Sequence, residues 1–498
     1  MDRGVVLTGA ILLYFAALIG FGWYGWRNGK RDFGDFTLAS KNLPVLALLL
    51  TTAATQHSMF VTVGAVGEFY RVGIVFLWAA GTWTLLQPLA YRHFGYRIWR
   101  VGTHFGHETP LDLFKERYAW KPLNLLVLAT LLVFIAPYIA AQTIGAGLVF
   151  ESISDGAISF EAGSGLLLGA MLVMVTLGGM RAVAWSDVLQ GGLTFVFLWI
   201  AALYLIFFAT PFPASELFTR VAEISPGHLQ ISGADYWSMG GLMALFALGL
   251  VFQPQLWQRL LIGRSPRANG QVAGTIALYL TLIFVPGFLI GLAALLLAPG
   301  LADSDSVLPV VVFEHLPIWI AIPLVAGVLA AGMSTIDGIL LTVSSLVTKD
   351  AGGMLVRDLA ARRDTMVWVA RVTIVVLAAG AYAMALARND TIVELTALGW
   401  TGPLQLLPAF IGAVYWPRGT KQGAFWGTLV GLAAVVATTF VWDSPLGIPP
   451  VFWSLPLNGL MFYVVSRSTP RTSADRLHRI FVDALGHEPE RVAGRHRT

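Results

Sequence analysis

Apolar segments of about 20 residues recur along the whole chain, and this feature restricts the fold more than any other. A helix of that length crosses the hydrocarbon core of a bilayer with its backbone hydrogen bonds satisfied internally. Charged residues make up 12% of the 498 residues and hydrophobic residues 56%. An ordinary soluble domain carries roughly 25% charged residues. The sequence therefore predicts an all-α polytopic membrane protein.

About 13 transmembrane helices fit the pattern, with boundaries uncertain by several residues. They cover residues 4–26, 43–66, 72–91, 122–149, 163–180, 184–209, 236–257, 268–298, 318–348, 365–387, 391–416, 422–441 and 449–466. An odd number of spans places the two chain ends on opposite sides of the membrane. With this topology, 28 of the 32 Lys and Arg residues fall on the side of the C-terminus. Because basic residues concentrate in cytoplasmic loops, we expect an outer N-terminus and a cytoplasmic C-terminus in the cell (inner) membrane.

Composition also excludes several classes of protein. The chain contains no cysteine, so disulfides, thiolate nucleophiles and cysteine-bound metals are excluded. The formal net charge of +4 is explained by the basic residues of the cytoplasmic loops, so nucleic acid need not be invoked as a partner. The lipid bilayer is the expected surrounding, and the sequence leaves the oligomeric state open.

Two predicted spans carry polar residues at mid-depth, where unpaired polar groups are costly. Residues 51–60 read TTAATQHSMF in the second span, and Phe252-Gln253-Pro254-Gln255 lies in the seventh. These spans occupy matching places in two five-span halves, which an odd span count inverts relative to each other. Counting the second span as core helix 1 and the seventh as core helix 6, we therefore predict that core helices 1 and 6 are discontinuous in a five-plus-five inverted-repeat core. The alternative is that hydroxyls bond to their own helix and that Pro254 only kinks it.

Core helix 8 contains two hydroxyl residues and an acid within one turn, namely Ser334, Thr335 and Asp337. A carboxylate inside a span is costly unless it is paired, protonated or bound to a cation. Asp337 is therefore a functional candidate. Asp187, near the inner end of core helix 5, is a second candidate, although it could simply cap a helix at the membrane interface.

Three stretches resemble signatures of the sodium/solute symporter family. Residues 178–191, GGMRAVAWSDVLQG, resemble the pattern GG-x-x-A-V-x-W-x-D-x-x-Q-G. Residues 421–427, KQGAFWG, resemble K-x-G-A-x-x-G, and residues 330–335, AAGMST, resemble A-A-x-x-S-T. The resemblance implies a division into an N-terminal extra helix with its inner loop (1–42), a first repeat (43–210), a second inverted repeat (236–416), two C-terminal helices (417–467) and a cytoplasmic tail (468–498).

The resemblance also implies a sodium ion, with no organic cofactor, between core helices 1 and 8. Carbonyls and hydroxyls provide the hard oxygen ligands that such a cation prefers. By residue-to-residue correspondence, the sodium ligands are Ala54, His57, Ala331, Ser334 and Thr335. Some family members hold a second sodium near the helix 5 acid with serines of helix 8, whereas the matching positions here are Asp337 and Gly338. Asp187 and Asp337 are therefore candidates for a second cation or a proton.

The resemblance places the solute beside the ion, between core helices 1, 3, 6 and 10. The candidate contacts are Gln56, His57, Ser58, Gln142, Gln253, Gln255, Trp400 and Gln405, of which Gln142, Trp400 and Gln405 rest on geometry alone. The imidazole of His57 could instead pack, and Gln255 stands where some members place an aromatic gate. No Lys or Arg is expected at mid-membrane, so helix ends and amides would hold an anion.

These features predict a sodium-coupled symporter that imports a small organic solute by alternating access. The solute is expected to be a monocarboxylate, a pantothenate-like acid or an amino acid, while polyols stay open. Proton coupling in the same fold and a transporter-like sensor are the alternatives. A membrane enzyme is disfavoured, because His104, His107 and Glu108 lack the spacing of a helical zinc motif.

Overall fold

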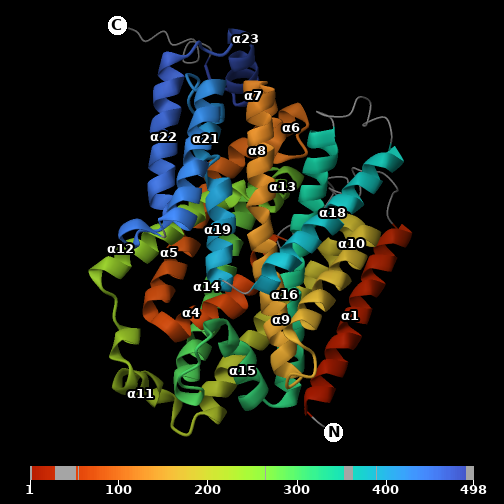
Figure 1. The fold of residues 1–498 in the computed structure, drawn as a ribbon, viewed down its shortest axis with the longest axis vertical. Coiled ribbons are helices and arrows are strands. Elements are labelled where there is room, and N and C mark those ends of the chain that lie inside the picture. Colours follow the sequence, from red (N-terminus) through yellow and green to blue (C-terminus); the bar gives the residue numbers. More distant parts are fainter. Residues whose placement is uncertain are drawn as a thin grey trace.

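The computed structural model describes residues 3–28, 52–53, 55–263, 265–352, 363–387, 390–442 and 444–488. Within these ranges the regular structure is helical, and no strand occurs. The helices form an elongated bundle, with the N-terminus at one end and the C-terminus at the other (Figure 1). The all-α prediction is confirmed.

The helices follow one another with short 3₁₀ and π turns, labelled η, between them. The first part of the chain contains α1 (Arg3–Asn28), η2 (Phe60–Gly64), α4 (Ala65–Val72), α5 (Ile74–Ala90), η3 (Tyr91–Gly95), α6 (Tyr96–Phe105), α7 (Pro110–Tyr118), α8 (Lys121–Val133), α9 (Ile135–Ile153), α10 (Phe160–Tyr204), η4 (Leu205–Ala209), η5 (Ala214–Glu216), α11 (Leu217–Ile224) and η6 (Pro226–Leu229). The second part contains α12 (Gly233–Gly249), η7 (Leu250–Phe252), α13 (Pro254–Ile262), α14 (Pro266–Leu297), η8 (Ser304–Ser306), α15 (Val307–His315), α16 (Ile318–Ser345), η9 (Leu346–Ala351), α18 (Arg363–Ala387), α19 (Ile392–Leu404) and α20 (Leu407–Val414). The last part contains α21 (Lys421–Val436), η11 (Ala437–Val441), η12 (Pro445–Gly447), α22 (Pro450–Ser468), α23 (Ala474–Leu477) and η13 (His478–Ala484).

Eight helices in the described residues are long and apolar enough to cross a membrane, and further apolar stretches lie within α1, α10 and α18. One predicted boundary differs from the structure. The spans predicted at 163–180 and 184–209 lie within a helical run that α10 and η4 form without an interruption. The Met, Arg and Ala residues that follow Gly178 and Gly179 all favour helix, so the helix continues through the predicted gap.

Helices α9 and α16 lie at the centre of the bundle and contact each other (Figure 1). Every residue of 137–150 in α9 and of 324–345 in α16 is buried. Small residues allow a third segment to approach both helices closely. A Cβ added at Gly145 would lie 2.8 Å from Met59, and one at Gly332 would lie 2.9 Å from it. The side chain of Met59 therefore fits between α9 and α16.

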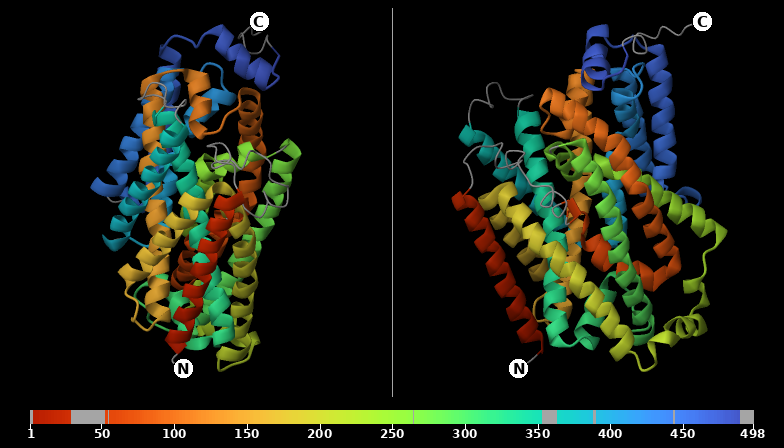
Figure 2. Two further views of the ribbon diagram at one scale, coloured as in Figure 1. Left: turned by 90° about the vertical axis from the view of Figure 1, so that its right-hand side faces the viewer. Right: turned by 180° about the vertical axis from the view of Figure 1, so that it is seen from behind.

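The C-terminal helices form a peripheral layer. Helices α21 and α22 pack against each other, and α23 and η13 lie across the C-terminal end of the bundle on α6 and α7 (Figure 2). Ile480 and Phe481 of η13 are fully buried there. Arg479 pairs with Glu116 of α7 at 2.9 Å, and Arg100 of α6 donates to the Ala484 carbonyl at 2.8 Å.

This contact leads to a stability prediction. A Phe481→Ala change should destabilise the fold by about 3–5 kcal/mol, because it removes a fully buried aromatic side chain. The thermal midpoint of the purified protein in detergent should fall accordingly. The control is His478→Ala, because that side chain is 55% exposed on the same helix. Equal midpoints for the two variants would show that the tail does not stabilise the bundle.

Candidate functional site

Core helix 1, described here from residue 55 to residue 72, is interrupted near its start. Residues 55–56 are helical, His57 and Ser58 are not, and helix resumes at Met59 before η2 and α4. The backbone N–H of Met59 donates to Gln142 Oε1 of α9 at 2.8 Å. A side chain thus accepts one of the amide groups that a helix start leaves without an intrahelical partner. The predicted break in core helix 1 is present.

Core helix 6 is interrupted at Gln253. Helix α12 and the turn η7 end there, Gln253 has an extended backbone with ψ 125°, and α13 begins at Pro254. Proline suits this position because its missing N–H is not needed in the first turn of a helix. Gln253 Nε2 donates to the Gly399 carbonyl of α19 at 3.3 Å. The second predicted break is therefore present as well. A hydrogen bond joins it to α19, which is core helix 10.

Four oxygen atoms lie close together between core helix 1 and α16, which is core helix 8. Thr335 Oγ1 lies 3.3 Å from the Thr55 carbonyl and 3.1 Å from the Ala331 carbonyl. Ser334 Oγ lies 3.2 Å from the same Ala331 carbonyl. Both hydroxyl residues are buried. This set of neutral, hard oxygen ligands is of the kind that suits sodium.

Three of the predicted sodium ligands, Ala331, Ser334 and Thr335, lie together in the structure. The carbonyl of core helix 1 that lies beside them belongs to Thr55, which had not been predicted. Ala54 lies outside the described residues. His57 Nδ1 lies 2.7 Å from the hydroxyl of Tyr279 in α14, and the two rings meet edge to face. The other ring nitrogen, Nε2, is buried and has no hydrogen-bond partner within the described ranges.

The two predicted acids differ in what can be described. Asp337 is fully buried in α16, as a functional or compensated carboxylate would be. Asp187 belongs to the helical run of α10, but its side chain lies outside the described residues.

Amide side chains surround the break in helix 1. Gln56 Nε2 donates to the hydroxyl of Tyr91 at 3.1 Å, and Gln87 Nε2 donates to Gln56 Oε1. Gln253 and Gln255 are buried, and their Oε1 atoms have no hydrogen-bond partner within the described ranges. Buried polar atoms in a native fold are nearly always satisfied, so such atoms indicate a place for a polar ligand.

Gln87 and Tyr91 had not been predicted as part of this cluster. The signal in the sequence was an amide directly before Pro88 inside an otherwise apolar span.

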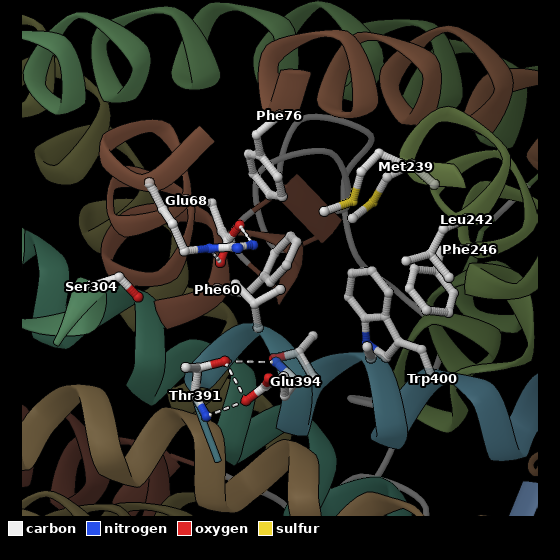
Figure 3. A pocket seen from close by; sticks show the side chains of 15 residues that line it. Phe60, Glu68, Phe76, Met239, Leu242, Phe246, Ser304, Thr391, Glu394 and Trp400 are labelled. Carbon is white, nitrogen blue, oxygen red and sulfur yellow. Dashed lines mark hydrogen bonds and ion pairs between the residues drawn. The ribbon is translucent and has the colours of Figure 1, made fainter. Parts of the chain in front are cut away.

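Aromatic side chains line a cavity between α4, α12 and α19. Trp400 stacks edge-on against Trp83 at 5.2 Å and lies 5.4 Å from Phe60, measured between ring centroids. Phe60 and Trp400 face the cavity in Figure 3, together with Phe246. The cavity has a volume of about 330 Å³, and its rim carries the ion pair of Glu68 and Arg71. A space of this size can accommodate a small organic solute.

Two predicted solute contacts have other partners. Gln142 accepts the Met59 amide, so at least its oxygen serves the helix break. Gln405 is turned away from the aromatic cluster, because its Nε2 donates to Ser454 Oγ at 2.9 Å and its Oε1 accepts from Asn458 at 3.0 Å. Its polar groups join the kink between α19 and α20 to α22.

One basic residue is more buried in the protein than the sequence suggested. The sequence assigned Arg259 to the inner loops, but the structure places it in α13 with a relative exposure of 2%. Its Nη2 lies 3.3 Å from Thr55 Oγ1. Arg259 is thus enclosed by protein a short distance after the break at Gln253.

Comparison with known proteins agrees with this geometry. A family model described as the sodium:solute symporter family matches residues 36–431. The sodium/proline symporter of Escherichia coli is 26% identical over 497 residues, covering 97% of this chain and 96% of that protein. The corresponding protein of Salmonella typhimurium is 25% identical over 486 residues, covering 95% of each chain.

Solved structures share the fold. A sodium-coupled sialic acid symporter in a substrate-bound outward-open state has a TM-score of 0.80 at 18% identity, covering 95% of this chain and 100% of that chain. MhsT in complex with L-phenylalanine has a TM-score of 0.53 at 16% identity, covering 85% and 98%. With two interrupted helices, a hydroxyl pair beside the first break and a family match over most of its length, the chain belongs to the sodium:solute symporter family.

Proposed function

We propose that this protein couples the inward movement of sodium to the uptake of a small amino acid across the cell (inner) membrane. The observation that carries the proposal is the oxygen cluster at the break of helix 1, where Thr335 Oγ1 lies 3.3 Å from the Thr55 carbonyl. Sodium is a transported ion in this scheme and not a resident cofactor. Symport of a small organic solute with sodium is the activity of the family. The amino-acid class is our choice among such solutes.

Several observations support an amino acid. Two curated relatives that align along nearly the whole chain are sodium/proline symporters. Most of the buried polar side chains at the breaks are amides and hydroxyls, which suit a solute without net charge, and Arg259 is a charged exception. Helix starts at Met59 and Pro254 carry partial positive charge that favours a carboxylate, and free carbonyls at helix ends favour an ammonium group. An amino-acid zwitterion carries both a carboxylate and an ammonium group, so it can interact with both kinds of helix end.

A monocarboxylate or pantothenate-like acid is the second candidate. The two helix starts, at Met59 and at Pro254, support it because their partial positive charges favour a carboxylate without needing an ammonium group. Uptake of such an acid with no uptake of amino acids would replace our first choice.

The arrangement suggests how transport is coupled. Helix 1 contributes to both sites, so sodium at Thr335 and solute near Gln56 would each stabilise the same conformation of the break. We place the N-terminal end of the bundle outside, so that the cavity beside Phe60 receives solute and the aromatic cluster closes around it. One charge crossing 100 mV provides about 2.3 kcal/mol. That is roughly a fifty-fold accumulation from the membrane potential alone.

Transport in proteoliposomes tests the proposal. Labelled L-proline, other neutral amino acids, monocarboxylates and polyols should be compared with an inward sodium gradient and with choline in its place. We expect one or more neutral amino acids to accumulate only with sodium. Accumulation in choline driven by a proton gradient would instead support proton coupling, and binding without accumulation would support a sensor.

A further inference from the structure

Three arginines lie at the end of the bundle that carries the C-terminus. Arg418 lies in the turn between α20 and α21, Arg467 in the last turn of α22, and Arg471 just after that helix. Burial lowers the pKa of the Arg418 guanidinium from its ordinary value, and the positive charges of Arg471 and Arg467 lower it further. None of the three forms an ion pair with a carboxylate in the part of the chain that the structure describes. Their positive charges therefore act on one another without compensation.

The turn that carries Arg418 is held in place from inside the protein. Arg117 of α7 is fully buried, and its Nη2 donates to the carbonyls on either side of Arg418, at 3.1 and 2.8 Å. Arg418 Nη2 donates to the carbonyls of Arg467 at 2.8 Å and Thr469 at 3.1 Å, where α22 ends and its last carbonyls lack intrahelical partners. Arg418 Nη1 is shielded from solvent and has no hydrogen-bond partner within the described ranges. An anion bound among the arginines would satisfy this donor.

Exposed apolar side chains continue from these arginines along α22. Tyr463 and Val464, one turn before Arg467, are exposed, and so is Leu460 one further turn away on the same face. The Tyr463 ring stacks on Trp416 with 5.6 Å between the centroids, and the Arg467 guanidinium lies 5.4 Å from the centroid of the Tyr463 ring. Trp and Tyr side chains are typical of the membrane–water interface. The arginines therefore lie at the level of lipid headgroups, next to a face of α22 that suits acyl chains.

We propose that Arg418, Arg467 and Arg471 bind the phosphate of an anionic phospholipid whose acyl chains lie along the exposed face of α22. Guanidinium groups match the oxygen atoms of a phosphate and donate charge-assisted hydrogen bonds to them. Basic clusters next to membrane spans attract the anionic lipids of the cytoplasmic leaflet, which is where we place this end of the bundle. A free phosphate ion could contact the same arginines, but it would gain nothing from the apolar face. The inference does not rest on the proposed function, because none of these residues belongs to the candidate ion or solute site.

Native mass spectrometry of the purified protein in detergent, with phosphatidylglycerol or phosphatidylcholine added, tests the proposal. The wild-type protein should bind phosphatidylglycerol more tightly than phosphatidylcholine, which carries no net charge. Arg418→Gln should bind phosphatidylglycerol about five-fold more weakly, and the triple variant with Arg467→Gln and Arg471→Gln about a hundred-fold more weakly. Arg479→Gln is the matched control. It removes one positive charge at the same end of the bundle, but this side chain is 55% exposed and pairs with Glu116 at 2.9 Å, so the affinity should stay unchanged.

Equal affinity of the wild-type protein for the two lipids would overturn the inference. Equal weakening by Arg418→Gln and Arg479→Gln would also overturn it, because the lipid would then respond only to net charge. Inorganic phosphate, compared with chloride at equal ionic strength, should not displace phosphatidylglycerol, and displacement would show a site for free anions instead. If Arg418→Gln does not fold, Arg471→Gln takes its place, because that side chain is exposed after the end of α22. An unchanged affinity for phosphatidylglycerol in Arg471→Gln would count against the site.

Discussion

A Thr335→Val protein should require about ten times more sodium for half-maximal uptake, and a Ser334→Ala/Thr335→Val protein should lose sodium-driven uptake. Valine matches threonine in shape but removes the oxygen that lies 3.3 Å from the Thr55 carbonyl. The loss of one neutral ligand to a cation is worth about 1.4 kcal/mol or more, which is a factor of ten. The measurement is the sodium dependence of initial uptake rates in proteoliposomes.

The chain offers a matched control for this prediction. Ser345 is a buried hydroxyl residue of the same helix, and its Oγ donates to the Leu341 carbonyl at 3.0 Å. Ser345→Ala should leave the sodium dependence unchanged. If it shifts the sodium dependence as much as Thr335→Val does, the hydroxyls contribute to helix 8 in general and not to an ion site.

The breaks could be predicted from the sequence because their chemistry is local. TTAATQHSMF places several polar groups in succession within an apolar span, and Pro254 cannot donate the hydrogen bond that a continuous helix needs. The hydroxyl pair of helix 8 was assigned instead from the resemblance of AAGMST to the family pattern A-A-x-x-S-T, and the structure places Thr335 beside the break in helix 1.

The direction of the glutamine side chains could not be predicted in this way. An amide in a membrane span can bind solute, cap a free backbone group or join two helices, and each role satisfies its hydrogen bonds equally well. Gln142 accepts a backbone amide, while Gln405 contacts α22, which the sequence placed outside the inverted-repeat core. These partners lie 83 and 49 residues away along the chain. Only the packing of the helices reveals them.

Arg259 was misplaced for a related reason. It follows the break in helix 6 by a few residues, and counting from the end of an apolar span assigned it to a loop. The structure shows that α13 continues the helix within the bundle and that all nine of its residues are buried. A discontinuous helix can bury polar and charged residues because its own break, and the neighbouring segments, provide partners for them.

The structure assigns Gln142 a role that predicts a large effect on both ligands. Gln142→Met should weaken sodium binding by about thirty-fold, because the buried N–H of Met59 loses its acceptor at a cost of about 2 kcal/mol. The cost applies to the conformation in which helix 1 is broken, which is the conformation that forms the ion site. The measurement is ²²Na⁺ binding to the purified protein in the absence of solute.

Measuring without solute separates this role from the solute contact that the sequence suggested. A residue that only contacts solute would change solute affinity and leave ²²Na⁺ binding as it is. Gln142→Glu keeps an oxygen 2.8 Å from the Met59 amide, next to a helix start that favours negative charge, and should retain most of the sodium affinity. If Gln142→Met binds sodium normally but takes up less solute, Gln142 contacts the solute, as the sequence suggested. Sodium binding that fails in Gln142→Met and recovers in Gln142→Glu would show that a side-chain oxygen on α9 holds the break in helix 1 open.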